Sequence, residues 1–197
     1  MDFDPMVEYH EYGTNQIYLK QNLKRSGKRI KRRKNLVSSY RFLEIGCNVD
    51  IATESAWRPG FDAVGIDVDA AAIAIAKTEF PECQFFAELS TAYVARGAKY
   101  DVIYCGEVIE HVPDLVSVLR SMKDLLTDGE VVRMSTPDAR HWRTPKNMIE
   151  WKELQPPDHI GIFNRKSLET APAKVDLGIL KPAINMKQGL KVLVTHA

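Results

Sequence analysis

FLEIGCNVD, residues 42–50, is the stretch that decides the fold. Its apolar run carries the acid Glu44 and then turns at Gly46. A strand that feeds a glycine turn is typical of nucleotide-binding α/β proteins, whose full motif reads acid-x-Gly-x-Gly-x-Gly. Here Asn48 and Asp50 stand at the second and third glycine positions. The motif is therefore weak by itself, and its interpretation depends on the residues that follow.

Predicted strands and helices alternate along the rest of the chain. We expect strands over 40–45, 63–67, 83–86, 100–107 and 131–135, and two closing strands over 175–180 and 190–196. Helices are expected over 50–57, 69–80 and 90–96, from Pro113 onward and from Ser167 onward. This alternation predicts a parallel sheet with helices on both faces. Such sheets bind ligands at the carboxyl ends of their strands, near the topological switch point.

The composition is that of an ordinary soluble protein, with 45% hydrophobic and 27% charged residues in 197. The longest apolar run, 70–76, is too short to cross a bilayer, and the acidic N-terminus does not resemble a signal peptide. Three scattered cysteines, Cys47, Cys83 and Cys105, indicate reduced core thiols. We therefore expect a cytoplasmic protein without a membrane span.

Basic residues are concentrated in the segment 20–34, which holds 9 of the 27 lysines and arginines and no acid. The remaining 18 basic residues are outnumbered by 26 acidic ones. Two domains are therefore predicted: a helical, basic arm over 1–39 and a main domain over 40–197. The segment 20–34 is either a solvated helix and loop or a patch that contacts the phosphates of nucleic acid or anionic lipid.

Acidic residues follow the second and third predicted strands. Asp67 ends the second strand 21 residues after Gly46, where its carboxylate can accept hydrogen bonds from both hydroxyls of a ribose. Glu88 follows the third strand and is placed to reach an adenine edge. A long motif, YDVIYCGEVIEHVPD, covers the fourth strand and the turn after it, residues 100–114.

In this order and spacing, the motifs resemble those of the class I S-adenosylmethionine-dependent methyltransferases, within the group that carries EVxEHVPD after strand four. FLEIGCNVD, GIDVDAAAIAIAK, QFFAEL and YDVIYCGEVIEHVPD each match one motif of that family, and QPPDHIGIFNRKSLE resembles its late segment. The match runs from about residue 40 to 170. The resemblance implies a Rossmann-like, doubly wound, three-layer α/β/α fold, mostly parallel with an antiparallel last strand.

The resemblance also implies roles for individual residues in binding S-adenosylmethionine and its product S-adenosylhomocysteine. The methionine end would be lined by Glu44, Gly46, Cys47 and Asn48, and its ammonium group would be received by carbonyls near Cys105 and Gly106. Asp67 would hold the ribose. The adenine would be flanked by Val68 and Leu89, with Glu88 near its amino group.

The departures from the motif concern the second and third glycine positions. Asn48 tolerates a positive φ better than most residues, so it can replace a glycine. Asp50 would weaken cofactor binding if its carboxylate pointed at that of the cofactor. If Asp50 points outward as the N-cap of the next helix, it is harmless, and we favour this arrangement.

The residues Glu107, Glu110 and His111 are spaced i, i+3, i+4, which would place them on one face of a helix. With His159 from the late segment they would suit Mg²⁺ or Mn²⁺. Two subfamilies of similar methyltransferases, for ubiquinone precursors and for small-RNA 3′ ends, use such a motif to bind a divalent ion. His111 and His159 are also the candidates for a general base acting on an acceptor hydroxyl.

Three functions remain open from the sequence. The leading one is methylation of a small molecule or saccharide at oxygen, with Tyr9, Tyr12, His141, Trp142 and Trp151 as further candidates for the acceptor site. The second is an RNA 2′-O-methyltransferase that uses the basic segment 20–34 and a metal. The third is a non-catalytic module that binds a partner, suggested by the missing glycines. A Rossmann dehydrogenase is disfavoured, because EVIEHVPD has no role in one.

Overall fold

The computed structural model describes residues 40–49, 53, 56, 61–182 and 189–197. The predicted arm over 1–39, with its basic segment 20–34, lies outside these residues, as do Tyr9, Tyr12 and Asp50. Within the helix predicted over 50–57, only Thr53 and Ala56 are described, and both are helical.

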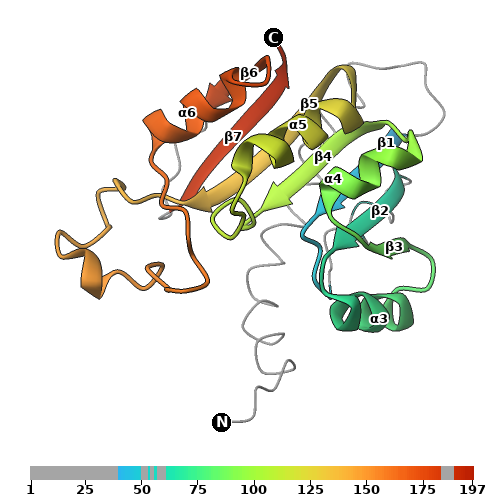
Figure 1. The fold of residues 1–197 in the computed structure, drawn as a ribbon, viewed down its shortest axis with the longest axis horizontal. Coiled ribbons are helices and arrows are strands. Elements are labelled where there is room, and N and C mark those ends of the chain that lie inside the picture. Colours follow the sequence, from blue (N-terminus) through green and yellow to red (C-terminus); the bar gives the residue numbers. More distant parts are fainter. Residues whose placement is uncertain (1–39, 50–52, 54–55, 57–60, 183–188) are drawn as a thin grey trace.

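The centre of the molecule is one seven-stranded sheet with the strand order β3-β2-β1-β4-β5-β7-β6 (Figure 1). Strands β1 to β5 run parallel, whereas β7 is antiparallel to both β5 and β6. The predicted parallel sheet with an antiparallel last strand is therefore confirmed. The strand bounds are β1 Tyr40–Ile45, β2 Phe61–Asp67, β3 Gln84–Ala87, β4 Tyr100–Gly106, β5 Leu126–Pro137, β6 Leu177–Pro182 and β7 Gly189–His196.

Helices pack on both faces of this sheet, which confirms the predicted three-layer arrangement (Figure 1). Leu119 and Met122 share a core with Ile103 of β4 on one face. Ile73 packs with Phe85 of β3 on the other face. The helices are α3 Ala70–Glu79, α4 Ser90–Tyr93, α5 Leu115–Leu125 and α6 Arg165–Ala173, with short 3-10 helices η1 Val94–Arg96 and η2 Met148–Glu150. None of the helices within the described ranges is long and apolar enough to cross a membrane.

The two longest helices begin where aspartate side chains can cap them. The Asp69 carboxylate accepts hydrogen bonds from the backbone of Ala71 and Ala72 at the start of α3. Asp114 likewise accepts a hydrogen bond from the Ser117 amide at the start of α5. Such caps satisfy amides that have no partner within the helix and contribute about 1 kcal/mol each.

Strand β5 is longer than predicted. The segment 127–130, expected as a turn, lies inside β5, and Gly129 has a φ of +78° there. The ladder with β4 shifts register between the pairs Tyr100–Leu126 and Val102–Val131, so the extra residues form an irregularity in the strand. The polar residues 127–130 therefore form a bulge within β5 and not a turn between helix α5 and the strand.

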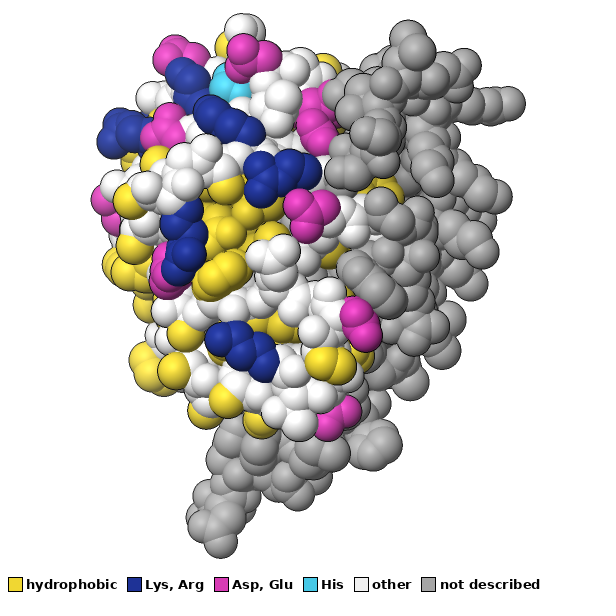
Figure 2. Space-filling view, turned by 90° about the vertical axis from the view of Figure 1, so that its right-hand side faces the viewer, with side chains coloured by type: hydrophobic (Ala, Val, Ile, Leu, Met, Phe, Trp, Pro, Cys, Tyr) yellow, Lys and Arg dark blue, Asp and Glu magenta, His cyan; other side chains and the backbone are white. Residues whose placement is uncertain are grey.

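Strand β3 forms one edge of the sheet. Figure 2 shows this side of the molecule, where lysine and arginine side chains surround an area of hydrophobic ones. The Arg96 guanidinium lies over the ring of Phe86, 4.3 Å from its centroid, and also stacks on Tyr93. A charged side chain that covers an edge strand discourages pairing with another chain.

The register of the sheet aligns the carboxyl ends of four strands, β1, β2, β4 and β5, at one end of the sheet. Ile45 at the end of β1 is paired with Ile66 of β2 and with Cys105 of β4. Gly106 at the end of β4 is paired with Ser135 near the end of β5. The chain order reverses between β1 and β4, so the predicted switch point lies there.

Candidate functional site

The turn after β1 has the backbone geometry that the glycine motif predicts. Gly46 has a φ of +75° and Asn48 a φ of +49°, so both occupy the left-handed region. The amides of Gly46 and Cys47 both donate to the Ile66 carbonyl of β2, at 2.9 and 3.1 Å. Asn48 therefore takes a glycine-like conformation, as expected from its tolerance of positive φ.

The Asp67 carboxylate connects the ends of β1 and β2. One oxygen accepts a hydrogen bond from the Asn48 amide at 2.8 Å, and the other accepts one from the Asp69 amide at 2.9 Å. Each oxygen retains a further lone pair, so the oriented carboxylate can still accept hydrogen bonds from a ligand. Asp69, and not Asp67, is the residue that caps α3.

Two large apolar side chains stand exposed after the neighbouring strands β2 and β3, one directly after Asp67 and the other two residues after the end of β3. Val68 is 67% exposed and Leu89 is 59% exposed. Glu88, predicted to lie near the adenine amino group, forms an ion pair with Arg96. The Nε of Arg96 donates a hydrogen bond to the Glu88 carboxylate at 3.2 Å. This hydrogen bond lowers the pKa of Glu88. Glu88 is therefore a charged acceptor, but one that already has a partner.

The predicted methionine end is more enclosed. Glu44 is 4% exposed and accepts a hydrogen bond from Thr53 at 2.9 Å. Tyr104 lies opposite Glu44 in the sheet, and burial, with the charge of Glu44 second, raises the pKa of this phenol. A Cβ at Gly106 would overlap the Tyr104 hydroxyl, so only glycine fits at the end of β4.

Glu107 begins the turn after β4 in an uncommon conformation for a side chain of its size. Its φ is +54°, and its amide donates to the Ser135 carbonyl at 2.9 Å. Its carboxyl group lies near Glu110, and burial followed by that neighbouring charge raises the pKa of Glu107 to about 7. By surface area, however, Glu107 is an exposed residue, so solvent screens the interactions that shift its pKa. Two acidic groups therefore share one end of β4.

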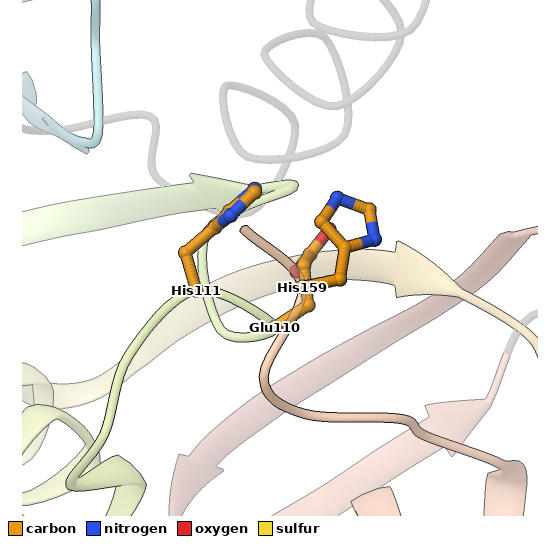
Figure 3. Close-up of side chains that lie close together, drawn as sticks. All are labelled: Glu110, His111 and His159. Carbon is orange, nitrogen blue, oxygen red and sulfur yellow. The ribbon is translucent and has the colours of Figure 1, made fainter. Parts of the chain in front are cut away.

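A cluster of Glu110, His111 and His159 lies beside this pair (Figure 3). One ligand atom from each side chain lies within 4.8 Å of the others. The imidazole rings meet edge to face, with centroids 4.6 Å apart. Glu110 and His111 come from the turn after β4 and His159 from the late loop, 48 residues after His111, so the tertiary structure creates the cluster.

Each histidine in the cluster is held by its Nδ1 atom. Nδ1 of His111 lies 3.0 Å from the Asp158 carbonyl, and Nδ1 of His159 lies 2.7 Å from the Glu153 carbonyl. Carbonyls only accept hydrogen bonds, so these contacts place a proton on each Nδ1, and in the neutral form of each ring the lone pair is then on Nε2. An imidazole held in this way can bind a cation or take a proton.

Glu110 is buried, with 1% of its surface exposed. Its Oε2 accepts a hydrogen bond from Thr136 at 3.1 Å, whereas its Oε1 has no hydrogen-bond partner among the described residues. Its carbonyl accepts from the amides of both Ile160 and Gly161 at 2.9 Å. These two bonds hold the late loop against the turn and bring His159 to His111.

The prediction that Glu107, Glu110 and His111 share a helix face was wrong. The residues 107–114 form turns and bends, and α5 begins only at Leu115. A positive φ at Glu107 is incompatible with a helix, and Pro113 disfavours helical backbone in the residue before it. The turn still brings Glu110 and His111 together, but Glu107 is not part of the three-residue cluster.

The residues that orient the site were not predicted from the sequence. Thr136 fixes Glu110, Ser135 binds Glu107, and Arg96 pairs with Glu88. The only signal in the sequence was that Ser135 ends the strand predicted over 131–135 and Thr136 directly follows it, at the ligand-binding end of the sheet. Of the other acceptor-site candidates, Trp151 is buried, whereas Trp142 is 71% exposed.

Comparisons with known proteins agree with this geometry. A family model described as a methyltransferase domain matches residues 12–181, which confirms the expected family. A ubiquinone biosynthesis O-methyltransferase of Albidiferax ferrireducens is 32% identical over 119 residues, 57% of this chain and 46% of that protein. One of Acinetobacter baumannii is 33% identical over 113 residues, 54% of this chain and 46% of that protein. The chain thus spans about half the length of these relatives.

Solved structures share the fold at low sequence identity. A magnesium protoporphyrin IX methyltransferase from Synechocystis has a TM-score of 0.71 and 13% identity, over 100% of this chain and 90% of that one. An S-adenosylmethionine-dependent methyltransferase from Clostridium acetobutylicum has a TM-score of 0.67 and 12% identity, over 86% and 88%. This chain belongs to the methyltransferase-domain family and has the fold of the class I S-adenosylmethionine-dependent methyltransferases.

Proposed function

We propose that this protein transfers the methyl group of S-adenosylmethionine to an oxygen atom of a small molecule or saccharide. The observation that carries the proposal is the Asp67 carboxylate, held at the end of β2 by the amides of Asn48 and Asp69. An acidic side chain at the end of β2, beside a left-handed turn after β1, is suited to a ribose.

The described residues fit the nucleoside end of the cofactor. Asp67 would accept hydrogen bonds from the two ribose hydroxyls, because both of its oxygens keep a lone pair. Val68 and Leu89 would cover the two faces of the adenine, which would remove their exposed apolar surface from water. Glu88 would approach the adenine amino group while keeping its contact with Arg96.

The methionine end would lie at the ends of β1 and β4. Glycine occupies positions 46 and 106 there, where a Cβ would overlap the side chains of Val108 and Tyr104 respectively. We assign this end to the side chain of Glu44, the backbone of Gly46, Cys47 and Asn48, and the carbonyls of Cys105 and Gly106. A cofactor ammonium group is well matched to carbonyls and to the acidic pair at the end of β4.

The chemistry demands little of the protein, because the sulfonium of the cofactor already activates the methyl group. The protein aligns the acceptor oxygen with the methyl carbon and sulfur, and excludes water. His111 or His159 would take the proton from the acceptor hydroxyl through its free Nε2 atom. O-methylation is also the activity in the names of the relatives, and this supports oxygen as the acceptor atom.

A divalent cation is the second candidate for the histidine cluster. Glu110 Oε1 and the Nε2 atoms of His111 and His159 could serve as metal ligands, and a carboxylate oxygen and imidazole nitrogens suit Mn²⁺ or Mg²⁺. The carbonyls behind both Nδ1 atoms are the outer-shell contacts that metal-binding histidines commonly make. Such an ion would supply a positive charge that orients and acidifies an acceptor hydroxyl. Glu107 lies outside the cluster and would bind the ion only after its side chain changed conformation.

Methyl transfer is tested with labelled S-adenosylmethionine and a panel of acceptors that includes catechol and a methyl glycoside. We expect label on the oxygen of at least one acceptor, and its loss in Asp67→Ala. Asp62→Ala, on β2 at the opposite end of the strand, is the control and should stay active. If no acceptor is labelled and S-adenosylhomocysteine does not bind, the non-catalytic partner module becomes the better description.

The cation is tested by thermal unfolding with Mn²⁺ and with a chelator. If the cluster binds Mn²⁺, the ion raises the Tm of the wild type but not that of His159→Gln. His196→Gln on β7 is the matched control and should keep the shift. An equal shift in both variants, or none in the wild type, argues for the general-base role.

A further inference from the structure

The ion pair of Glu88 and Arg96 is a two-point contact. Nε of Arg96 donates to Oε2 of Glu88 at 3.2 Å, and Nη2 of Arg96 donates to Oε1 of Glu88. The side chains of Arg96 and Glu88 are 44% and 29% exposed, and ion pairs at such a surface contribute little to stability. Two parallel hydrogen bonds do, however, fix the orientation of both groups. Orientation, and not stability, is therefore what this contact provides.

The Arg96 guanidinium lies on aromatic rings that are themselves fixed. Its Cζ atom is 4.3 Å from the ring centroid of Phe86 on β3 and 5.4 Å from that of Tyr93 on α4. The rings of Phe86 and Tyr93 are in contact, with centroids 5.6 Å apart. Tyr93 is 3% exposed, and its hydroxyl lies 2.7 Å from that of the buried Tyr100. Side chains of the hydrophobic core therefore hold the group that orients Glu88.

Glu88 lies next to the proposed ribose site. Ala87, the last residue of β3, is paired with Asp67, the last residue of β2, and Glu88 directly follows Ala87. The next residue, Leu89, is 59% exposed and is one of the two side chains proposed to cover the adenine. A nucleoside whose ribose is bound by Asp67 would therefore have its base on the side of Glu88.

The protonation state of Glu88 suits an amino group. The hydrogen bonds from Arg96 lower the pKa of Glu88, so its carboxylate is ionised and acts only as an acceptor. The 6-amino group of adenine donates hydrogen bonds, whereas the 6-oxo group of hypoxanthine accepts them. Hypoxanthine also carries a donor, the N1–H beside its 6-oxo group, and a carboxylate that is free to turn could bind there. Discrimination between the two bases therefore requires a carboxylate with a fixed orientation.

We propose that Arg96 is a positioning residue that makes the cofactor site specific for adenine over a 6-oxo purine. It would hold Glu88 toward the 6-amino group and prevent it from turning to the N1–H of hypoxanthine. It would also remove the rotamer freedom that a glutamate otherwise loses when a ligand binds. Because its Nε and Nη2 donate to Glu88, these nitrogens are not offered to a 6-oxo group. This inference rests on the proposed function and names the residue behind the specificity of that site.

The test is calorimetric titration with S-adenosylhomocysteine and with S-inosylhomocysteine, which differ only at the 6-position of the purine. Arg96→Gln removes the charge and the two-point contact, whereas Arg96→Lys keeps the charge alone. Glu88→Gln replaces the acceptor by an amide that can also donate. The matched control is Arg165→Gln, which breaks an exposed ion pair with Glu169 on α6. The readout is the ratio of the two affinities on the same protein, so a general loss of folded protein cancels.

We expect the wild type to prefer S-adenosylhomocysteine by roughly 30-fold, as hydrogen bonds to charged groups commonly allow. Arg96→Gln should lower this ratio by roughly tenfold, because the freed carboxylate can turn to the N1–H of the inosyl ligand. Arg96→Lys should lie between the two, and Glu88→Gln should lose the preference. The control should keep the wild-type ratio within about twofold, as expected of a surface change away from the site.

The outcomes separate this inference from the proposed function. If the wild type binds S-adenosylhomocysteine and Arg96→Gln keeps the full ratio, Arg96 does not position Glu88 and the inference is overturned. Equal binding of both ligands by the wild type would also overturn it, while the proposed function would stand. Binding of neither ligand by the wild type would contradict the proposed function and overturn the inference with it.

Discussion

Gly46 and Val108 are packed so closely that no side chain fits at position 46. A Cβ there would overlap Cγ2 of Val108 and would lie 3.4 Å from its Cβ. Gly46 begins the turn after β1, and Val108 belongs to the turn after β4, so this contact joins the two loops of the proposed cofactor site. The φ of +75° at Gly46 adds a second, independent requirement for glycine.

Gly46→Ala should therefore lower the free energy of unfolding by about 2–4 kcal/mol, from overpacking and from left-handed strain together. Adding Val108→Ala should recover only the overpacking part. Urea denaturation of the wild type, both single variants and the double variant measures this coupling. If the losses of the two single variants simply add in the double variant, the contact with Val108 does not explain the requirement.

Asn48 should be replaceable by glycine but not by a β-branched residue. Its φ of +49° suits glycine, so Asn48→Gly should change the stability by no more than about 0.5 kcal/mol. Asn48→Val should cost at least about 1–2 kcal/mol, because a β-branched side chain is strained there. The comparison uses thermal unfolding of the two variants. Similar losses in both would show that the side chain, and not the backbone conformation, matters at this position.

Thr136 should stabilise the buried Glu110 through its hydroxyl group. Thr136→Val keeps the shape of the side chain but removes the hydrogen bond to Oε2 of the buried Glu110. We expect this loss to cost about 1–3 kcal/mol of the free energy of unfolding. Thr136→Ser keeps the hydroxyl and should lose less. Chemical denaturation distinguishes the two variants, and a smaller loss for Thr136→Val than for Thr136→Ser would contradict the proposed role of the bond.

Glu107 should make the protein less stable as the pH rises toward neutrality. Its pKa in the folded protein is about 7 against a usual 4.5, because burial and the charge of Glu110 disfavour its ionised form. The native state therefore holds this proton more tightly than the unfolded chain, and the stabilisation is complete below pH 4.5 and lost as the pH rises through 7. Since the side chain is partly solvated, we expect a loss of about 1 kcal/mol.

The measurement for Glu107 is the free energy of unfolding between pH 4.5 and 8, for the wild type and Glu107→Gln. The variant should lack this part of the pH dependence and should be the more stable protein at pH 8. Parallel pH profiles for the two proteins would show that Glu107 titrates normally.

The sheet was predictable because apolar strands, acidic strand ends and capping aspartates all indicate the same alternation. The bulge in β5 was not predictable, because the polar stretch TDGE, residues 127–130, has the composition of a turn. The nature of 107–111 was also misjudged, since an i, i+3, i+4 spacing brings side chains together in a turn as well as in a helix. The positive φ of Glu107 could not be predicted from the sequence, because glutamate has no preference for that conformation.

The candidate site was predictable only in its individual residues. The position of Asp67 at the end of β2 is predictable from the sequence, whereas its amide donors depend on the conformation of the turn at Asn48. The pairing of His111 with His159 depends on a loop of more than 20 residues whose path is fixed by the bonds from Ile160 and Gly161 to Glu110. Such a path follows from tertiary contacts and not from spacing.

The central claim is that Asp67 holds the ribose of S-adenosylmethionine, and calorimetric titration with S-adenosylhomocysteine tests it most directly. The protein should first be freed of copurified ligand, and Asp67→Ala and the control Asp62→Ala should be measured beside the wild type. Our account predicts micromolar binding by the wild type and the control, and a loss of at least tenfold in Asp67→Ala. Equal affinity in Asp67→Ala, or no binding by the wild type at millimolar ligand, would contradict it.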